Sequence, residues 1–388
     1  TGEKVSIDSN GNVSLASSIA VTGVTTAAAF IPSKGQLSNR NIAINGAMQV
    51  SQRATSNTNS DQGYRTCDRF TVSWSGLDSV VEQHKVILTS GTPYDLGFRY
   101  AWQLKNGDQT GGAGASDYIQ AEYRIEARDI AQSGWDYTSS SSYITLSFWL
   151  KTSVQQDFTI NFTSFDGTSQ RYPMKTGTIA ANTWTKITKT VPGGSNVQFD
   201  NNTGKGMAIM FYPYLGNNYV GGSSLNTWSA ASTPNFGGSN ESAWYTTDDA
   251  TFEVTGFQLE VGEHATPFEH RSYAEDLRRC QRYYQQLPTS GDHVMWGFGR
   301  AESNSARVQV PLSVPLRASP TLTCDANRSC RYDGTMVQST TTPSVFKWDN
   351  EFASIIIDFA SGGTLSHNNV YIITSDSGST GLKMDAEI

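Results

Sequence analysis

The sequence has few cysteines, little charge and no long apolar run, and each shortage excludes a class of protein. Only 4 cysteines occur in 388 residues, which is too few for a disulfide-built scaffold. Charged residues make up 16% of the chain, and its net charge of −7 disfavours binding to nucleic acid. No apolar stretch reaches the roughly 18–20 residues that span a bilayer, and no signal peptide is visible. We therefore expect neither a nucleic-acid partner nor membrane insertion.

Two of the cysteines lie close together in the sequence. Cys324 and Cys330 flank an expected turn and could form a disulfide. The other interpretation is a chain with four reduced thiols, which a reducing compartment would favour. No group of cysteines and histidines has the spacing of a zinc site, so the cysteines predict no metal site.

What the chain does contain is a series of short apolar segments separated by Gly, Ser, Thr and Asn. In residues 119–125 and 144–150, apolar and polar side chains alternate, which is typical of antiparallel strands with one buried face. Further strand signals lie at 70–72, 158–162, 184–188, 207–212 and 252–261. Seven or more such strands with Gly-rich connections predict a jelly-roll sandwich over residues 61–270 in an all-β protein.

The regions before the sandwich differ from it in composition. Residues 1–35 alternate on both sides of an Asn-Gly-Asn turn, which predicts a β-hairpin. Because one hairpin cannot bury its own apolar face, either three copies wind into a trimeric β stalk or this region is a loose tail. Residues 36–60 contain a short apolar segment and then a polar stretch, which we interpret as a neck and linker.

One helix and a second β-rich unit are expected after the sandwich. Ser272 and Glu275 have the spacing of a capping box, and Tyr273, Leu277 and Cys280 follow near helical spacing. This pattern predicts a connecting helix over 271–287, which packs either on a sheet or in a three-helix junction. Alternating segments between 308 and 386 predict a small C-terminal β-sandwich, a tip domain, over 288–388.

Several of these segments, in this order, resemble a jelly-roll module of phage tail-fibre and virion proteins. The resemblance covers roughly 120–320 and implies a virion appendage, trimeric assembly and a carbohydrate-binding-like sandwich. The family more often has Gln-Arg-Ile-Glu where this chain has Ala-Glu-Tyr-Arg at 121–124. The similar stretches are IQAEYRIE at 119–126, TLSFWLK at 145–151, the Asn-Thr-Trp at 182–184, GFQLEVG at 256–262, ATPFE at 265–269, the helix segment 275–284 and VPLRASPT at 314–321.

The alternation assigns one set of polar and aromatic side chains to a shared second face of the sandwich. An aromatic ring can stack on the C–H face of a sugar while amides and carboxylates pair with its hydroxyls. The other interpretation is that this face packs against a neighbouring domain or subunit. The candidate ligand-binding residues are Trp149, Gln120, Glu122, Arg124, Lys151, Asn161, Tyr212 and Gln258.

Aromatic residues outside this face form two weaker candidate sites. One set lies in segments rich in Gly, Ser and Asn, where each ring either contacts ligand or anchors a loop in the sandwich. The other set lies in the tip domain, which would meet a host first if the N-terminal end is attached to the particle. The two sets are Trp102, Trp135, Trp228, Trp244 and Tyr245, and Trp296, Tyr332, Trp348, Asp349 and Asn350.

Metal binding and catalysis receive less support from the sequence. Asp248, Asp249 and Glu253 could hold a structural calcium ion, or they could form a solvated acidic turn. The five histidines are scattered, and no nucleophile motif is present, so we assign no catalytic residue and no other cofactor.

These observations together predict a homotrimeric, non-enzymatic phage fibre or spike located on the virion. We expect it to bind a host surface glycan and to join other virion proteins through its N-terminal end. A purely structural appendage, such as a capsid fibre or tail adaptor, is the main alternative, and a polysaccharide-degrading tailspike is the second.

Overall fold

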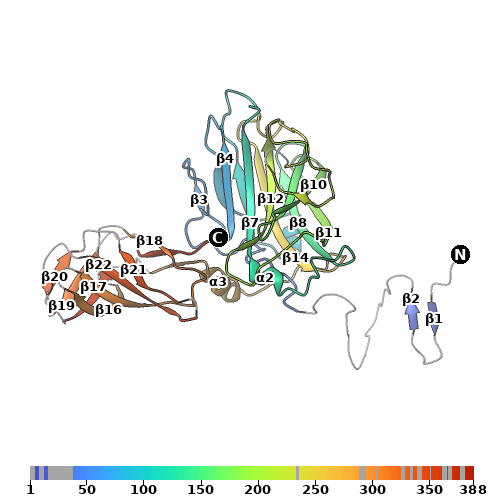
Figure 1. The fold of residues 1–388 in the computed structure, drawn as a ribbon. Coiled ribbons are helices and arrows are strands. Elements are labelled where there is room, and N and C mark those ends of the chain that lie inside the picture. Colours follow the sequence, from blue (N-terminus) through green and yellow to red (C-terminus); the bar gives the residue numbers. More distant parts are fainter. Residues whose placement is uncertain are drawn as a thin grey trace.

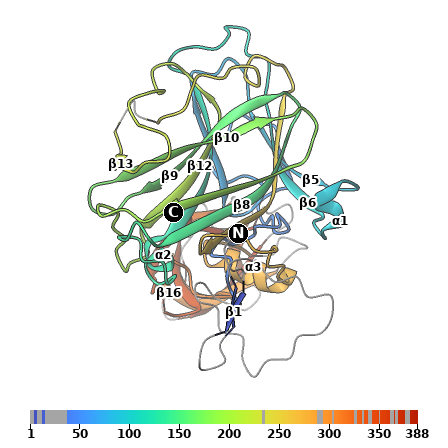
Figure 2. The ribbon, with the colours of Figure 1, turned by 90° about the vertical axis from the view of Figure 1, so that its right-hand side faces the viewer.

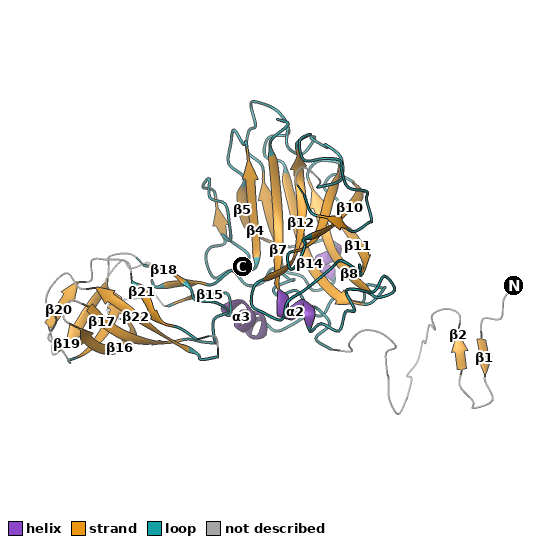
Figure 3. Ribbon diagram, viewed as in Figure 1, coloured by secondary structure: helices purple, strands orange, loops and turns teal. Residues whose placement is uncertain are grey.

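The computed structural model describes most of the chain and is all-β, with three short helices among the described residues (Figures 1 and 3). None of these helices has the length and apolar character needed to cross a membrane. The described residues are 5–7, 13–15, 38–232, 236–287, 294–302, 305–324, 328–332, 335–338, 343–349, 351–360, 365, 369–375 and 381–388.

Two six-stranded antiparallel sheets form the sandwich that the alternation predicted. The first sheet has the order β13-β10-β9-β12-β7-β4, and the second has the order β11-β8-β14-β6-β5-β3. The first sheet contains β4 (Phe70–Ser75), β7 (Tyr118–Glu126), β9 (Gln156–Ser164), β10 (Gln170–Ile179), β12 (Lys205–Leu215) and β13 (Ser229–Ala230). The second contains β3 (Ser56–Asn57), β5 (Glu82–Ile87), β6 (Tyr100–Lys105), β8 (Tyr143–Thr152), β11 (Thr185–Pro192) and β14 (Thr251–Val261).

The sandwich core is made by the apolar halves of the alternating strands. Ile119 and Tyr123 of β7 face Phe148 of β8, and all three are at most 1% exposed. Aromatic rings interlock across the two sheets: Phe148 lies 5.0 Å from Phe211, and Tyr123 lies 5.1 Å from Phe257, between ring centroids. Tilted and edge-to-face contacts of this kind add to the free energy gained by burying the rings.

Residues 41–50, which we expected in a neck and linker, lie at the base of the sandwich. Asn41 donates to the Phe257 carbonyl oxygen at 3.0 Å, and Ala43, Met48 and Val50 are fully buried. The hydroxyl of Tyr123 accepts a hydrogen bond from the backbone N–H of Ile44 at 2.6 Å. This segment is therefore part of the sandwich in the described structure.

Helix α3 (Tyr273–Gln281) begins as predicted but is shorter than predicted. Ser272 Oγ accepts a hydrogen bond from the Glu275 backbone N–H at 3.2 Å, as the capping box requires. The helix ends at Gln281, because residues 284–286 form a strand, β15 (Tyr284–Gln286), that pairs with β24 (Lys383–Asp385). The cross-strand pairing overrides the helical pattern of residues 282–287. The helix buries Cys280 against the base of the sandwich.

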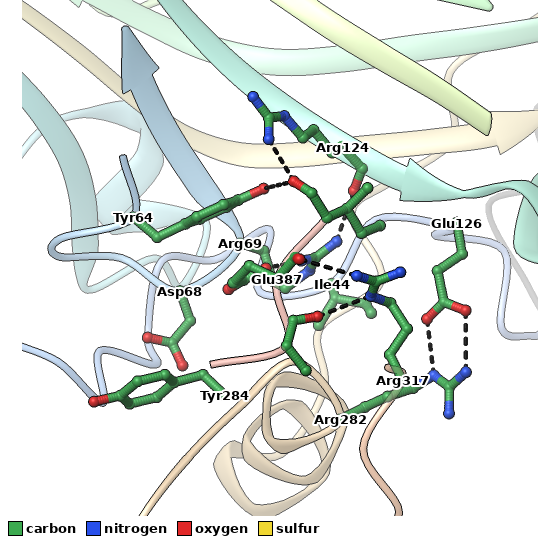
Figure 4. Close-up of polar contacts among 12 residues, drawn as sticks. Ile44, Tyr64, Asp68, Arg69, Arg124, Glu126, Arg282, Tyr284, Arg317 and Glu387 are labelled. Atoms are coloured by element: carbon green, nitrogen blue, oxygen red, sulfur yellow. Dashed lines mark hydrogen bonds and ion pairs between the residues drawn. The ribbon is translucent and has the colours of Figure 1, made fainter. Parts of the chain in front are cut away.

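The base of the sandwich also holds residues 385–388, through an ionic network drawn in Figure 4. Arg69 is 1% exposed, forms an ion pair with Glu387 and packs its guanidinium 3.4 Å from the ring centroid of Tyr283. Arg53 pairs with Asp385 at 2.9 Å. Arg124 donates to the Ile388 main-chain oxygen. The two β units are thus joined by buried charges as well as by the chain connection.

The tip domain consists of a seven-stranded sheet and a three-stranded sheet, with its own core. The large sheet has the order β20-β19-β23-β16-β17-β22-β21, and the small one has the order β15-β24-β18. The remaining strands are β16 (Met295–Glu302), β17 (Ser305–Pro311), β18 (Thr321–Thr323), β19 (Arg328–Tyr332), β20 (Thr335–Gln338), β21 (Ser344–Lys347), β22 (Ser354–Ala360) and β23 (Val370–Ser375).

The predicted N-terminal hairpin is present as strands β1 (Val5–Ile7) and β2 (Val13–Leu15), which pair antiparallel. The rest of the predicted stalk, residues 1–4, 8–12 and 16–35, lies outside the described residues. Cys67 and Cys280 are buried free thiols, and burial raises the pKa of both, which suits inert structural positions. The predicted disulfide between Cys324 and Cys330 stays a prediction, because the side chain of Cys330 lies outside the described residues.

Candidate functional site

The second sheet carries an open groove on its outer face. The groove encloses a cavity of about 560 Å³, and its floor is formed by β8, β11 and β14. One wall is the turn after α1 (Thr92–Asp95), which lies beside β5 and β6 in Figure 2. The other wall is the segment 265–270. The lining residues are Leu96, Phe98, Ser147, Trp149, Lys186, Gly256, Ala265, Thr266, Pro267, Phe268 and His270.

Trp149 forms the centre of the groove floor. It lies on β8 between Phe148 and Leu150, which point into the core, so its ring must point outward, where it is half-buried. Gly256 lies beneath the ring in a left-handed conformation, with φ 62°, at an irregularity in the pairing of β8 with β14. A Cβ at this position would lie 2.8 Å from the Phe98 ring and 3.1 Å from the Trp149 ring. The glycine therefore lets the two rings approach the backbone closely.

The charged side chain at the floor of the groove is a lysine, so the floor carries positive charge. Lys186 of β11 is exposed and stands beside Trp149 in the strand register. Lys151 pairs with Glu253 at 2.8 Å, and Gln103 donates to the same carboxylate at 3.1 Å. Among the described residues, no aspartate or glutamate lines the cavity.

The wall 265–270 is held in place by two buried side chains of β14. Gln258 Nε2 donates to Glu260 Oε1 at 2.9 Å, and Gln258 Oε1 accepts from the Glu269 backbone N–H at 2.8 Å. Glu260 accepts from the backbone N–H of Thr266 at 2.8 Å. Gln258 is fully buried, so it positions the wall and does not face the cavity. This corrects its predicted role as a ligand contact.

The aromatic side of the groove is an interlocked set of rings. Phe98 lies 4.8 Å from Phe268 and 5.0 Å from His270, between ring centroids. His270 Nε2 hydrogen-bonds the Leu96 carbonyl oxygen at 3.1 Å, which joins the two walls. Phe268 and His270 come from a link segment that alternation does not reach, and Phe98 follows a short turn. The sequence signal that could have found them is the Pro-Phe-Glu-His run at 267–270, in the link between β14 and α3.

The predicted binding face is divided between two sheets, which is a correction. Trp149, Lys151 and Gln258 belong to the second sheet, whereas the other five candidates belong to the first. Strand alternation separates inward from outward side chains but does not say on which sheet a strand lies. The five candidates on the first sheet are Gln120, Glu122, Arg124, Asn161 and Tyr212.

The outer face of the first sheet is covered by the chain itself. Asn161 donates to the Phe236 carbonyl oxygen at 3.0 Å, and Tyr212 packs 5.6 Å from the Phe236 ring. Burial raises the pKa of Tyr212, as expected for a phenol shielded from water. Glu122 is 2% exposed and pairs with Arg124 at 2.7 Å. Residues 385–388, from the neighbouring C-terminal unit, cover part of this face as the packing interpretation expected. Another part is covered by the loop after β12, which belongs to the sandwich itself.

The acidic residues proposed for calcium are not brought together. Asp249 pairs with Lys105 at 2.6 Å, and Glu253 is held by Lys151 and Gln103 on the groove side of β14. Within the described part of the chain, no cluster of three or more metal-binding side chains is found. Asp248 and Asp249 form an exposed turn ahead of β14, which matches the alternative of a solvated acidic turn.

The aromatic residues expected in loops are mainly buried, and Trp102 lies on strand β6. Trp102, Trp244 and Tyr245 are at most 1% exposed, and Trp135 is 3% exposed. Trp228 donates from Nε1 to the Pro192 carbonyl oxygen at 2.7 Å. In the tip, Trp296 is buried and Trp348 is half-buried, whereas the side chain of Tyr332 and all of Asn350 lie outside the described residues.

Comparisons with known proteins give distant structural likenesses only. Neither a protein-family model nor a curated protein sequence matches this chain. The enzymatically active domain of tailspike protein 4 from bacteriophage CBA120 is 14% identical with a TM-score of 0.31, covering 57% of this chain and 21% of the tailspike. The chain thus matches about a fifth of the length of that protein.

Two carbohydrate-binding modules give likenesses of a similar level. The CBM22-1 xylan-binding domain of Paenibacillus barcinonensis Xyn10C is 11% identical with a TM-score of 0.26, covering 54% of this chain and 94% of that domain. The family 11 module of Clostridium thermocellum, solved with a β-1,3-1,4-mixed-linked tetrasaccharide, is 10% identical with a TM-score of 0.24, covering 52% and 91%. All three TM-scores lie below 0.5, and the groove's own residues carry the proposal below.

Proposed function

We propose that this protein binds a glycan in the groove on its second sheet, with Trp149 as the stacking platform. The observation that carries the proposal is a half-buried tryptophan on the floor of an open cavity of about 560 Å³. Ligand sites are concave, mostly apolar, and contain a few polar groups that fix orientation. A flat ring with donors and acceptors around it suits a pyranose, whose C–H face is apolar and whose edge carries hydroxyls.

The polar groups for those hydroxyls surround the ring. Ser147 lies two residues before Trp149 on the same outward row, and Thr266 lies on the wall. Lys186 adds a flexible ammonium beside the platform. The predicted ligand contacts Trp149 and Lys151 are near each other here, although Lys151 is engaged by Glu253.

We also propose that binding occurs without cleavage. Glycoside hydrolysis usually requires two carboxyl groups on either side of the scissile bond. Among the described residues, no carboxyl group lines the cavity, and the nearby Glu253 forms an ion pair with Lys151. These features support a non-enzymatic role, and the tailspike alternative would require a second site elsewhere on the chain.

At the level of the whole particle, we propose a homotrimeric phage fibre that attaches to a host through this groove. The series of segments that resembles virion modules supports the phage role, and the hairpin β1–β2, too small to be stable alone, supports assembly of several copies. A purely structural appendage is the second candidate, favoured by the extent to which the first sheet is already covered by the chain.

A glycan array with the purified chain and its Trp149→Ala variant tests the proposal. We expect binding to a subset of glycans, and a loss of at least tenfold in affinity in the variant, since stacking and ring burial are both removed. Trp348→Ala removes a half-buried tryptophan far from the groove and serves as the matched control. Binding that is absent, or equal in all three proteins, would contradict the proposal, and released oligosaccharides would contradict the non-enzymatic role.

A further inference from the structure

The tip domain exposes one face of its strands β23, β16, β17, β22 and β21, and the described part of this face is unusually apolar. Its inward side chains, such as Val308 and Ile357, are fully buried. Of the ten large hydrophobic side chains that are exposed in the described residues, six belong to the tip. They are Met295 (59% exposed), Phe298 (57%), Phe346 (50%), Phe352 (63%), Val370 (60%) and Ile372 (39%).

The strand register arranges this outer face in two rows. In the first row Phe298 of β16 pairs with Ile372 of β23 on one side and with Gln309 of β17 on the other. Gln309 in turn pairs with Ile356 of β22, so the row runs across four strands with an apolar residue at both ends.

The second row lies two residues further along each strand. It runs from Val370 through Arg300 and Arg307 to Asp358. Arg307 pairs with Asp358 at 3.3 Å and covers the Phe346 ring at 4.0 Å from its centroid. The row thus ends in an apolar residue on β23 and an acidic residue on β22, with two arginines between them.

The apolar area of this face is that of a protein interface. Phe298 on β16, Phe346 on β21 and Phe352, which lies in the turn before β22 and lines one cavity with Ile356 of this face, are half to two-thirds exposed. Together they leave roughly 340 Å² of apolar surface in water, at about 200 Å² for a whole ring. The apolar part of one side of a standard interface is roughly 450 Å². Adding Met295, Val370 and Ile372 brings the face above that figure. A lone tip domain would expose a patch at or above the upper end of what monomers tolerate.

We infer that this face is covered by further copies of the same chain, arranged around a three-fold axis parallel to its strands. On such an axis, equivalent residues keep their height, so the β16–β23 half of one face meets the β21–β22 half of the next. Phe298 then packs on Ile356 of the next copy, and Arg300 meets Asp358 of the next copy. Arg300 and Asp358 carry opposite charges, which suits this contact between copies, and the ring closes after three copies. The inference rests on the proposed trimer and assigns its contact surface.

Cross-linking tests the contact directly in the full chain. In the double variant Phe298→Cys/Ile356→Cys, the two cysteines of one copy are separated by β17, at roughly 9.5 Å between backbones. This exceeds the roughly 7 Å that a disulfide can bridge, so a bond between the two introduced cysteines must join two copies. We expect a covalent species of three chains after mild oxidation. The pair Arg300→Cys/Asp358→Cys repeats the test one row further along.

The matched controls are the unchanged chain, which contains the natural cysteines, and Ile87→Cys, which places a thiol at a 71% exposed apolar site on the sandwich. A species of two chains only would overturn the three-fold arrangement. Cross-linking yields equal to those of the controls in both double variants would overturn the proposed contact between the two halves of the face. The native mass of the unchanged chain decides the proposed trimer separately, and its glycan binding decides the groove, so each failure is distinguishable from the others.

Discussion

The two outer faces of the sandwich begin from similar strands and end in different states. The first sheet is covered by the loop that follows β12 and by residues 385–388, so its polar side chains are paired within the protein. The second sheet has two walls, the turn after α1 and the segment 265–270, and leaves Trp149 half-buried on the open floor between them. The difference teaches that a polar, aromatic strand face becomes a binding site only where the rest of the chain leaves it uncovered.

The strongest way to break the covered face is to remove the cation at its base. Arg69→Ala leaves Glu387 buried without its nearest partner, and both side chains are at most 5% exposed. We expect the free energy of unfolding to fall by about 3–5 kcal/mol, as for other broken buried pairs. Urea unfolding measures this, with the exposed Arg65→Ala as the control. A loss below about 1 kcal/mol would contradict a stabilising role for the network.

A substitution with a smaller expected effect uncovers the part of the first sheet that the loop after β12 covers. Phe236→Ala removes the half-buried ring over Tyr212 and Arg171. Because the ring is only partly buried, we expect a loss of about 2 kcal/mol, below the range for fully buried phenylalanines. Glycan affinity should stay unchanged, since the groove lies on the other sheet. A variant that gains or loses glycan binding would show that the covered face takes part.

The contribution of charge on the open face can be tested by reversing the charge of Lys186. Lys186→Glu places a carboxylate beside Trp149, whereas Lys186→Gln only removes the cation. For a glycan that carries carboxylate or sulfate groups, we expect up to about fivefold weaker binding in the glutamine variant and a larger loss in the glutamate variant. A neutral glycan should be affected little. Calorimetry on an acidic polysaccharide and its carboxyl-reduced form measures both, and identical behaviour of all proteins on both would exclude a role for this charge.

The smallest expected effect is that of acidic pH on the segment 265–270, which forms one wall of the groove. Burial opposes ionisation of Glu269, but hydrogen bonds from the backbone of residues 39–41 and the charge of Arg271 lower its pKa below the usual 4.5. A lowered folded-state pKa gives stability that is present above about pH 4.5 and lost as the pH falls through the folded value. Glycan binding should therefore weaken below that pH, and Glu269→Gln should reproduce a weakened wall at neutral pH. Affinity that is flat from pH 7 to pH 3 would contradict this.

The sequence was informative where the chemistry is local. Alternation placed Ile119 and Phe148 in the core and Trp149 on the surface, and the capping box placed the start of α3. Each of these predictions depends only on residues that lie within a few positions of one another in the sequence. Nothing local says which sheet a strand joins, so Glu122 and Trp149 were expected on one face and lie on opposite ones.

The rest of the site depends on contacts that are distant in sequence. Gln258 has the composition of a sugar contact, but its partners at 266 and 269 turn it inward to hold the wall. The helix was expected to continue to 287, but β24, about 100 residues later, recruits 284–286 into a strand. Such pairings are decided by tertiary packing, which pattern reasoning along one segment does not include.

The insertion of residues 385–388 into the base of the sandwich has a consequence for biosynthesis. Arg69 emerges from the ribosome some three hundred residues before Glu387, so this buried ion pair at the base of the sandwich can form only after the tip domain has been translated. A product truncated before Asp385 would retain Arg69 buried without its carboxylate partner, whereas Arg124 would keep Glu122. The base of the sandwich is therefore completed only after the strands of both β units have been made.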